Sequence, residues 1–467
     1  MTNIDAGSEV VPPPFRQTVR LSQPLQRFAM VTAILILFTS SFDIFLVINA
    51  GGNYRFCQVI LAPLTILAIT KVLWGDRLIL TLGSLWLSAW FFFQVAFIPS
   101  TDFWPKSLGY CLWLLLNLGM MFCFVQLFSD NSQAVRMLLR WYVYSFAFVA
   151  AFGIFQFALP VFGLPGILIT QWWIPNVLPR VNGFSYEPSY FASYLLIGFV
   201  LVSSLKRARS TLLSSRTLNG IYYLIALGIV VSSSRLGIVF LLAEVLFGGK
   251  IPWLSFLANL KRPRVVRSKV RSLVPSLLVF AFLLTLSSGA VMFMRSNPVL
   301  LLMFLNGTGV SNTAAHSVIQ RENALRETIA VFLQHPFIGR SLGGISSAIA
   351  EYEGNTIRSF EDAKQIDGMS VFAEVLAASG VIGFIPFLCF LVVTIRNPLR
   401  LARITSPFYS SLLRGLVRSL VFTWAILQFN QNVLRSYLWA HLAILATVYA
   451  AALKSARSQP QSSGTPT

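Results

Sequence analysis

A series of apolar runs, each about as long as the hydrocarbon core of a bilayer, constrains the fold of this chain more than any other feature. A helix needs about 20 apolar residues to cross that core. Such runs lie near residues 28–48, 57–74, 78–98, 107–128, 138–160, 189–205, 218–233, 236–249, 273–294, 370–395, 415–430 and 435–453. The pattern predicts an all-α, polytopic membrane protein of about twelve transmembrane helices.

The composition excludes a set of soluble domains. Of the 467 residues, 56% are hydrophobic and only 11% are charged, whereas a soluble domain carries about 25% charged residues. The net charge of +20 would fit a nucleic-acid partner if it were spread over a soluble surface. The basic residues instead gather in short loops between apolar runs, as the positive-inside rule describes. We therefore expect these basic loops to lie at the lipid bilayer, and we do not expect the protein to bind nucleic acid.

The same rule predicts how the chain lies in the membrane. With the N-terminus in the cytoplasm, most lysines and arginines fall in cytoplasmic loops, and an even number of spans returns the C-terminus to that side. We therefore expect a disordered cytoplasmic tail over 1–27, a membrane domain over 28–453 and a second cytoplasmic tail over 454–467.

Three segments then remain on the outer face: residues 161–188, the turn 232–237, and a loop over 296–367 between the ninth and tenth spans. The loop is far longer than an ordinary connection between helices. Long loops on a rigid scaffold often carry binding or catalytic residues. We expect the functional site on this face, with the loop capping a cavity that is open to lipid.

Part of that loop is predicted to be an amphipathic helix over 320–334, which Pro336 ends. Its apolar face comprises Leu325, Ile329, Phe332 and Leu333. Arg321 falls at the edge of this face and is expected to point toward the helix bundle or the lipid. Glu322 and Arg326 are four residues apart and are expected to form a weak surface pair.

Glu187 is the leading candidate for a catalytic base. Pro188 forces the residue before it into an extended conformation and suits the first position of a helix, so Glu187 is expected at an N-cap. The helix dipole favours a carboxylate there. Gly183 allows the backbone to fold back toward Arg180. Charged residues kept at a membrane boundary are costly and indicate function, and a structural ion pair that caps the helix is the alternative. Asp367, a candidate N-cap of the tenth span, is a second possible base.

Five arginines are predicted on the outer face, where the positive-inside rule disfavours them. A guanidinium group binds phosphate with a planar fork and keeps its charge in a low dielectric, which suits a diphosphate at a membrane surface. The candidates for diphosphate binding are Arg180, Arg235, Arg321, Arg326 and Arg340. Contact with lipid headgroups is the alternative.

Neither a metal site nor a cofactor is expected. The histidines 316, 335 and 441 show no zinc-ligand spacing and no Ser-His-Asp arrangement. The Asp-x-Asp signature of metal-dependent sugar-nucleotide enzymes is missing. The four cysteines all fall within apolar runs, which indicates no disulfide framework.

Several ordered motifs resemble the O-antigen polymerase and O-antigen ligase superfamily. They are Arg180-x-x-Gly-Phe-x-x-Glu-Pro-Ser before a span, Ser232-Ser-Ser-Arg-Leu-Gly237, Arg321 with a helix ending in His335-Pro-Phe-Ile-Gly339, and Leu376-Ala-Ala-Ser-Gly-Val-Ile-Gly383 after a large outer loop. The resemblance covers about residues 180–395. It implies a helical, metal-independent glycosyltransferase in the bacterial cytoplasmic membrane, acting on polyprenyl-diphosphate-linked glycans for O-antigen or exopolysaccharide synthesis.

The resemblance also separates two activities within the superfamily. Ligases usually carry a histidine just before the last of these motifs, and this chain has Met369 or Ser370 there. We therefore favour a polymerase that joins lipid-linked repeat units, with a flippase and a chain-length regulator of the same pathway as further partners. A ligase that transfers glycan to a lipid or protein is the first alternative. A twelve-span transporter is the second, although no internal repeat supports it.

Overall fold

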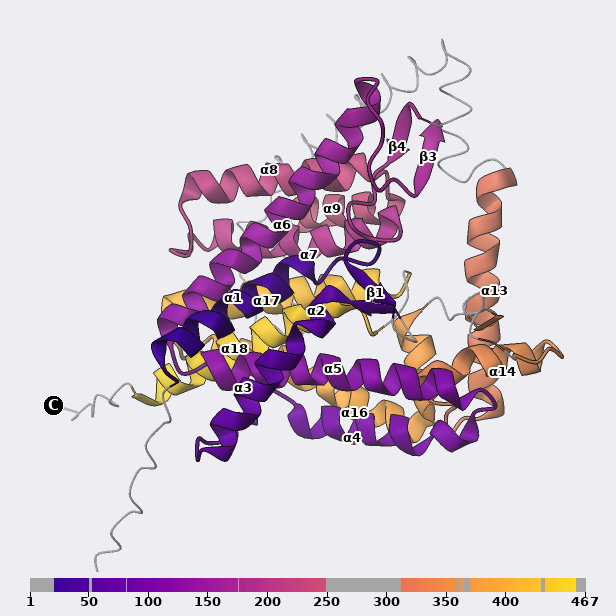
Figure 1. The fold of residues 1–467 in the computed structure, drawn as a ribbon, viewed down its shortest axis with the longest axis horizontal. Coiled ribbons are helices and arrows are strands. Elements are labelled where there is room, and N and C mark those ends of the chain that lie inside the picture. The colour runs from indigo at the N-terminus through magenta and orange to yellow at the C-terminus, as the bar shows by residue number, and fades with distance from the viewer. Residues whose placement is uncertain are drawn as a thin grey trace, which may run out of the picture.

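The computed structural model describes residues 21–49, 53–80, 82–174, 176–248, 312–357, 359, 362–363, 370–429 and 433–458. Within these ranges the chain is mostly helical, with two short strand pairs (Figure 1). Residues 1–20 of the predicted tail over 1–27, the predicted ninth span over 273–294, parts of the loop over 296–367, and residues 459–467 lie outside the described residues.

Six helices are long and apolar enough to cross a membrane. They are Phe56–Leu73 (α2 with α3), Trp104–Phe128 (α5), Ser132–Val161 (α6), Pro188–Arg207 (α7), Val371–Leu401 (α16) and Ser436–Ser458 (α18). Three shorter apolar helices are Gln23–Thr39 (α1), Ser84–Ala96 (α4) and Ser215–Val231 (α8). The chain therefore has the character of a multi-pass membrane protein, and the count of about twelve spans stays a prediction.

The remaining elements are shorter or less apolar. The helices are Phe56–Val59 (α2), Leu61–Leu73 (α3), Arg235–Phe247 (α9), Asn312–Gln334 (α13), Ile345–Tyr352 (α14) and Pro407–Ile426 (α17), with 3₁₀ turns at Ile98–Ser100 (η1) and Leu342–Gly344 (η3). The strands Val47–Asn49 (β1) and Asn53–Arg55 (β2) form one antiparallel pair. Gln171–Ile174 (β3) and Leu178–Arg180 (β4) form the other.

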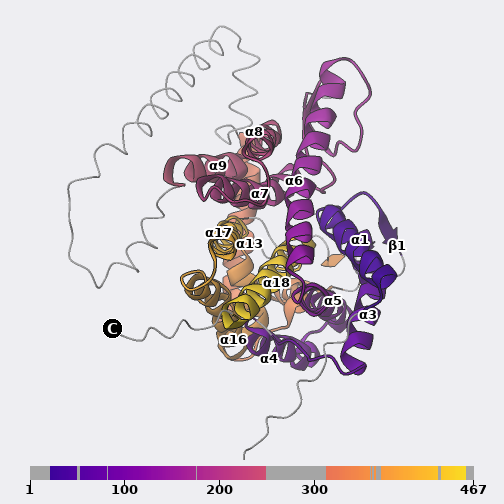
Figure 2. The ribbon, with the colours of Figure 1, turned by 90° about the vertical axis from the view of Figure 1, so that its left-hand side faces the viewer.

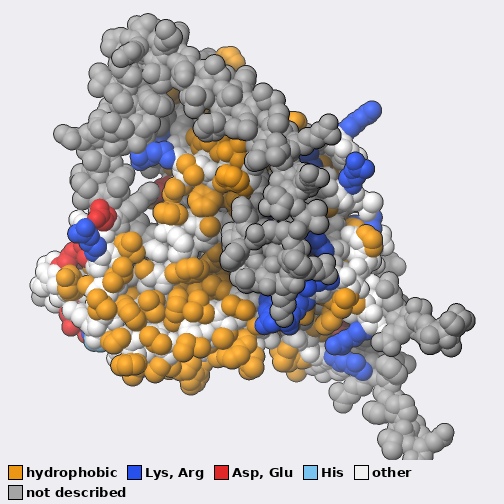
Figure 3. Space-filling model, turned by 180° about the vertical axis from the view of Figure 1, so that it is seen from behind, with side chains coloured by type: hydrophobic (Ala, Val, Ile, Leu, Met, Phe, Trp, Pro, Cys, Tyr) orange, Lys and Arg blue, Asp and Glu red, His pale blue; other side chains and the backbone are white. Residues whose placement is uncertain are grey.

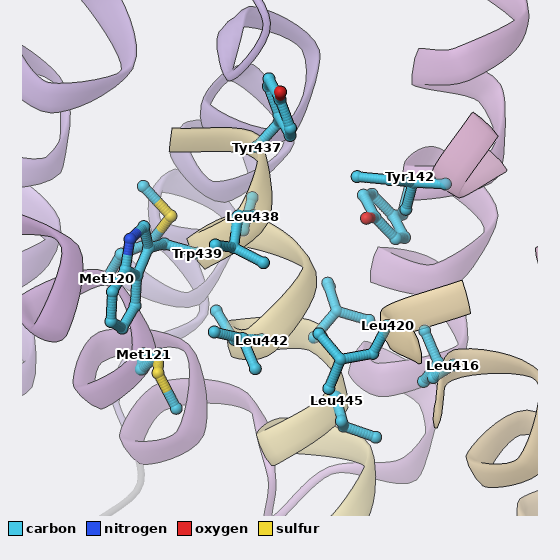
Figure 4. Close-up of a cluster of buried hydrophobic side chains, with 14 of the residues drawn as sticks. Met120, Met121, Tyr142, Leu416, Leu420, Tyr437, Leu438, Trp439, Leu442 and Leu445 are labelled. Carbon is cyan, nitrogen blue, oxygen red and sulfur yellow. The ribbon is translucent and has the colours of Figure 1, made fainter. Parts of the chain in front are cut away.

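The centre of the bundle is built on α7 and α18, which are buried along almost their whole length. Figure 4 shows part of this core, where leucines of α17 and α18 and Met120 and Met121 of α5 surround Trp439 and Tyr142. The Trp439 indole donates to the carbonyl oxygen of Val433 at 2.7 Å. A buried indole N–H needs such a partner, so this bond fixes the loop before α18 onto its own helix.

Both strand pairs lie at one end of the helical bundle, together with α14 and the N-termini of α7 and α18 (Figure 1). We call this the hairpin end. The 41–44 segment after α1 is fastened there, because the backbone N–H of Asp43 donates to the carbonyl oxygen of Phe184 at 2.9 Å. The hydroxyl of Ser185 likewise donates to the carbonyl oxygen of Ser41 at 3.2 Å.

The opposite end of the bundle is held by buried ion pairs. The fully buried carboxylate of Glu244 in α9 contacts Arg207 of α7 at 2.7 Å and Arg418 of α17 at 2.8 Å. Lys71 and Asp76, both buried, are 2.8 Å apart. Buried charges of this kind are stable only when they are paired. The three helices α7, α9 and α17 are therefore joined through one carboxylate.

The surface between the two ends is apolar. Figure 3 shows a broad hydrophobic area, with acidic and a few basic side chains at its left edge, the hairpin end, and most of the visible basic side chains toward the other side. Exposed apolar side chains of α4 and α16 include Leu85, Phe92, Ile385 and Val392. A band of this kind between polar ends is expected of a protein whose sides face lipid.

Each predicted apolar run except 273–294 overlaps a described helix, but several boundaries differ. The run 28–48 is helical only to Thr39, because the residues from Ser41 to Ile44 bond to Phe184 and Ser185 of another segment. The helix predicted over 320–334 ends at Gln334 as expected and begins earlier, at Asn312.

The residues of the predicted apolar face of that helix differ in burial. Ile329 is 44% exposed and Leu333 is 69% exposed, whereas Val331 and Thr328 are buried. The helix α13 contacts α14 and α16, and Thr328 and Val331 are the fully buried residues of its described part.

Candidate functional site

The polar segment before α7 is held by one glutamine of α6. The side-chain oxygen of Gln156 accepts hydrogen bonds from the backbone N–H groups of Asn182 (3.1 Å) and Gly183 (2.9 Å). Gly183 has a φ of +56° and lies against the ring of Phe191. Glycine adopts this conformation at little cost. The backbone therefore turns at Gly183, as its sequence predicts.

Glu187 occupies the N-cap position of α7, and Pro188 is the first helical residue, both as predicted. The Glu187 side chain makes no capping bond to the helix backbone. It accepts a hydrogen bond at 2.9 Å from the hydroxyl of Ser189 and is half-buried. The carboxylate is thus oriented by a neighbouring hydroxyl without serving as a helix cap.

Arg180 lies in the β3–β4 pair, upstream of this turn. Its guanidinium donates to the side-chain oxygen of Gln171 at 2.8 Å, across the strand pair. The side chain is half-buried. Cross-strand pairing therefore fixes the direction of this arginine, and Gly183 and the segment that follows connect it to Glu187.

Arg235 is the first residue of α9 and is exposed. The turn before it is sharp: Ser233 has a φ of +54°, and the Ser234 hydroxyl accepts the backbone N–H of Gly237 at 3.3 Å. Gly237 packs closely on Ala192 of α7, since a Cβ at this glycine would lie 2.7 Å from that of Ala192. The serine-rich motif is therefore a capped turn that brings the α9 N-terminus against α7.

Two other motifs from the sequence are docked onto each other. The backbone N–H groups of Arg340 and Ser341 donate to the carbonyl oxygens of Ala377 (3.2 Å) and Ala378 (2.8 Å). Those carbonyls are available because α16 is kinked at Gly380, which has a φ of +57°. Gly339 also lies directly against the backbone of Ala378. The segment after α13 is thereby seated in the break of α16.

Arg340 is anchored at this junction. Its guanidinium donates to the carbonyl oxygen of Ser100 at 2.5 Å and pairs with Glu351 of α14 at 3.0 Å. The nearby His335 has a pKa below its ordinary value, because partial burial and the charge of Arg340 disfavour the protonated imidazole, while Glu351 acts in the opposite direction.

The remaining predicted residues are only partly placed. Arg326 forms the expected exposed pair with Glu322, at 2.6 Å. Arg321 lies in α13, and its side chain is outside the described part of the structure. Asp367 is also outside the described residues. The tenth predicted span begins after it, with Ser370 at the N-cap position of α16 instead of Asp367.

Sequence reasoning missed a charged cluster at the hairpin end. The Asp43 carboxylate bonds to Arg55 at 2.8 Å and to Arg435 at 3.1 Å. Arg435 lies 3.6 Å over the ring of Tyr190, in the first turn of α7. Asp43 and Arg435 are 392 positions apart in sequence, so no local pattern joins them. The only signal was a charge inside or at the start of an apolar run.

The electrostatics of this cluster keep Arg435 ionised. Burial lowers the pKa of its guanidinium, but the negative charges of Asp43 and, to a smaller extent, Glu187 more than offset this and raise the pKa above its ordinary value. Glu187 is thus close enough to act on Arg435. The structure therefore brings a predicted site residue together with an arginine that was not predicted.

No protein-family model matches the chain, and no curated protein matches its sequence. Among the described residues, no group of three or more His, Cys, Asp and Glu side chains is placed to hold a metal ion.

Proposed function

We propose that this protein is a membrane glycosyltransferase that polymerises glycan repeat units carried on polyprenyl diphosphate. One observation carries the proposal. Glu187 is a half-buried carboxylate at the tip of a central, buried helix, it is not used as a cap, and it interacts electrostatically with Arg435 at the hairpin end of an apolar bundle. A base beside cations at a membrane boundary suits the transfer of a glycan from an anionic lipid carrier.

The reaction assigns a role to each group. A hydroxyl of the acceptor repeat unit attacks the anomeric carbon of the growing glycan, and Glu187 accepts the hydroxyl proton. The bond between that carbon and the diphosphate oxygen breaks, and the electron pair leaves with the polyprenyl diphosphate. Arg180, Arg235 and Arg321 stabilise the charge that develops on this leaving group. Arg326 and Arg340 are further candidates, and Asp367 is the second candidate base.

The proposed orientation puts the hairpin end outside the bacterial cytoplasmic membrane and both termini in the cytoplasm. The surplus of basic side chains away from the hairpin end supports this orientation (Figure 3). Lipid-linked glycans presented by a flippase would then reach the hairpin end from the outer leaflet, and a chain-length regulator would act on the same product.

The test is transfer by the purified protein in lipid nanodiscs supplied with polyprenyl-diphosphate-linked repeat units. Products are separated by glycan length. A ladder of longer carrier-linked glycans supports the polymerase. Two variants are compared. Glu187→Gln should abolish the ladder. Arg136→Gln changes a half-buried arginine near the far end of the bundle and should leave the ladder intact.

Other outcomes decide against the polymerase. Transfer that occurs only when a lipid or protein acceptor is added would assign a ligase instead. No transfer from any lipid-linked donor by well-folded protein would overturn the glycosyltransferase. In cells, deletion of a polymerase leaves single-repeat surface glycans, whereas deletion of a ligase leaves long glycans on the carrier.

A further inference from the structure

The cluster of Asp43, Arg55 and Arg435 has an excess of positive charge. One carboxylate holds two guanidinium groups side by side, and both arginine side chains are mostly buried, with 17% of Arg55 and 10% of Arg435 exposed. Arg55 also donates to the hydroxyl of Ser436 at 3.3 Å. Guanidinium groups held this way present their remaining N–H donors in a fixed direction.

Three helix N-termini add to this charge. Arg55 immediately precedes the helix Phe56–Leu73, Glu187 precedes α7, and Arg435 precedes α18. Each N-terminus carries about half a positive charge. Two guanidinium groups and three helix N-termini together outweigh the carboxylates of Asp43 and Glu187. The field at this point therefore favours an additional anion.

Two buried donors in the same cluster lack an acceptor within the described part of the chain. They are the Nε–H of Arg435, a residue 8% exposed, and the hydroxyl of Tyr437, a residue 2% exposed. The charges of Arg435, Asp43 and Arg55 all act on Tyr437. Buried donors in folded proteins almost always have an acceptor. An anion with several oxygens would supply one to each.

This cluster and the predicted arginine Arg235 lie on opposite sides of α7. Arg435 packs on Tyr190, whereas the first turn of α9 packs on Ala192. Two residues turn a helix by about 200°, so the two faces point apart. Figure 2 shows α9 on one side of α7 and α18 on the other. A ligand at Arg435 therefore occupies a different surface from a ligand at Arg235, and Glu187 stands at the helix tip between them.

We propose that Arg55 and Arg435 form a phosphate-binding site for the diphosphate of a lipid-linked substrate, with Asp43 as the residue that positions both arginines. A diphosphate offers oxygens to both guanidinium forks and to the Tyr437 hydroxyl. The identity of the ligand rests on the proposed function, but the binding of a phosphate group does not.

Binding of inorganic pyrophosphate to the full-length protein in nanodiscs of zwitterionic lipid tests the site directly. We expect Arg55→Gln and Arg435→Gln to raise the dissociation constant about tenfold or more, since a hydrogen bond to a charged group contributes on that order. Arg435→Lys keeps the charge beside Asp43 and should still lose affinity, because the fork is gone. Arg136→Gln should bind as the wild type does. Equal binding by all the variants would overturn the site.

Two further arms identify the ligand. Phosphatidylglycerol is added to the nanodiscs: if it competes fully with pyrophosphate, a lipid headgroup is the occupant and the carrier assignment is wrong. If polyprenyl diphosphate competes with pyrophosphate in the wild type and not in Arg435→Lys, the result supports the lipid carrier as the ligand of this site. Because binding is measured without turnover, the two proposals separate. If pyrophosphate binds through these arginines but the protein transfers no glycan, only the proposed function is overturned. If the protein transfers glycan but the variants bind pyrophosphate as the wild type does, only the proposed phosphate site is overturned.

Discussion

The backbone N–H of Val381 donates a hydrogen bond of 2.8 Å to the carbonyl oxygen of Pro336. This bond closes the junction between the segment after α13 and the break in α16. Both residues belong to motifs on which the resemblance to the O-antigen polymerase and O-antigen ligase superfamily rests. In the folded chain the two motifs are therefore one structural unit, in which a loop replaces a missing helical turn.

Gly380→Ala should disrupt this junction. Gly380 has φ +57° and ψ −177°, a combination open essentially to glycine alone, and an added Cβ would meet the backbone of Phe337. We expect a loss of about 1–3 kcal/mol of stability, measured as a lower melting temperature in detergent. Gly119→Ala is the control, since its Cβ would meet nothing within 4 Å. An unchanged melting temperature in Gly380→Ala would contradict the described junction.

Glu187→Gln should separate catalysis from helix capping. The amide keeps the shape of the side chain and its contact with Ser189 but cannot accept the hydroxyl proton. We expect normal protein yield and a rate lowered by about a hundredfold or more, as for loss of a general base. The measurement is glycan transfer with matched amounts of protein. Full activity would return Glu187 to a structural role.

Arg235→Lys tests whether this arginine clamps a diphosphate. If Arg235 only contacts headgroups, lysine should replace it, because both side chains extend their charge to the membrane surface. If it binds phosphate through both arms of its fork, lysine keeps the charge and loses the geometry. We expect normal insertion, poor elongation in the lysine variant and none in Arg235→Ala. Wild-type rates in Arg235→Lys would remove this residue from the clamp.

Glu244→Gln should destabilise the protein without touching the proposed site. The buried Glu244 carboxylate lies between Arg207 and Arg418, and breaking a buried pair of this kind costs about 3–5 kcal/mol. We expect a large fall in melting temperature. Glu322→Gln, in an exposed pair with Arg326, should cost less than about 0.5 kcal/mol. Similar melting temperatures for the two variants would show that the Glu244 pairs contribute little.

The orientation in the membrane is tested by labelling single cysteines in a variant without the four native ones. Asn355, beyond α14, and Thr211, between α7 and α8, are both exposed. In intact spheroplasts an impermeant thiol reagent should label Asn355→Cys and spare Thr211→Cys. Permeabilised cells, in which both should react, are the control. The reverse pattern would invert the orientation and place the proposed site in the cytoplasm.

Local signals in the sequence predicted the helices well. Pro188 and Glu187 mark the start of α7, Pro336 marks the end of α13, and the three serines before Arg235 mark a turn, because in each case neighbouring residues determine the backbone. Boundaries were missed where distant contacts decide them. The first helix stops at Thr39 because residues 41–44 bond to Phe184 and Ser185.

The site was predicted only in part for the same reason. Glu187 and Arg180 stand in one motif and could be read together. Asp43 and Arg435 meet only after the chain has folded, and so do Glu244 and Arg418. A single sequence shows which residues are charged, but it does not show which of them meet in the folded chain. Periodicity placed four apolar residues of α13 on one face, but it could not show that Thr328 and Val331 are buried.

The burial of α7 and α18 has a consequence for biogenesis. These two share the lowest mean hydropathy of the six membrane-length helices, and 89% of the apolar stretch of each is buried in protein. Segments of this kind partition less readily into lipid on their own, so each needs partners already in the bilayer when it leaves the translocon. Because α18 is synthesised last among the described helices and lies at the centre, integration is expected to finish only when it docks. Nascent chains that end before residue 436 should therefore be recognised by membrane quality control and degraded.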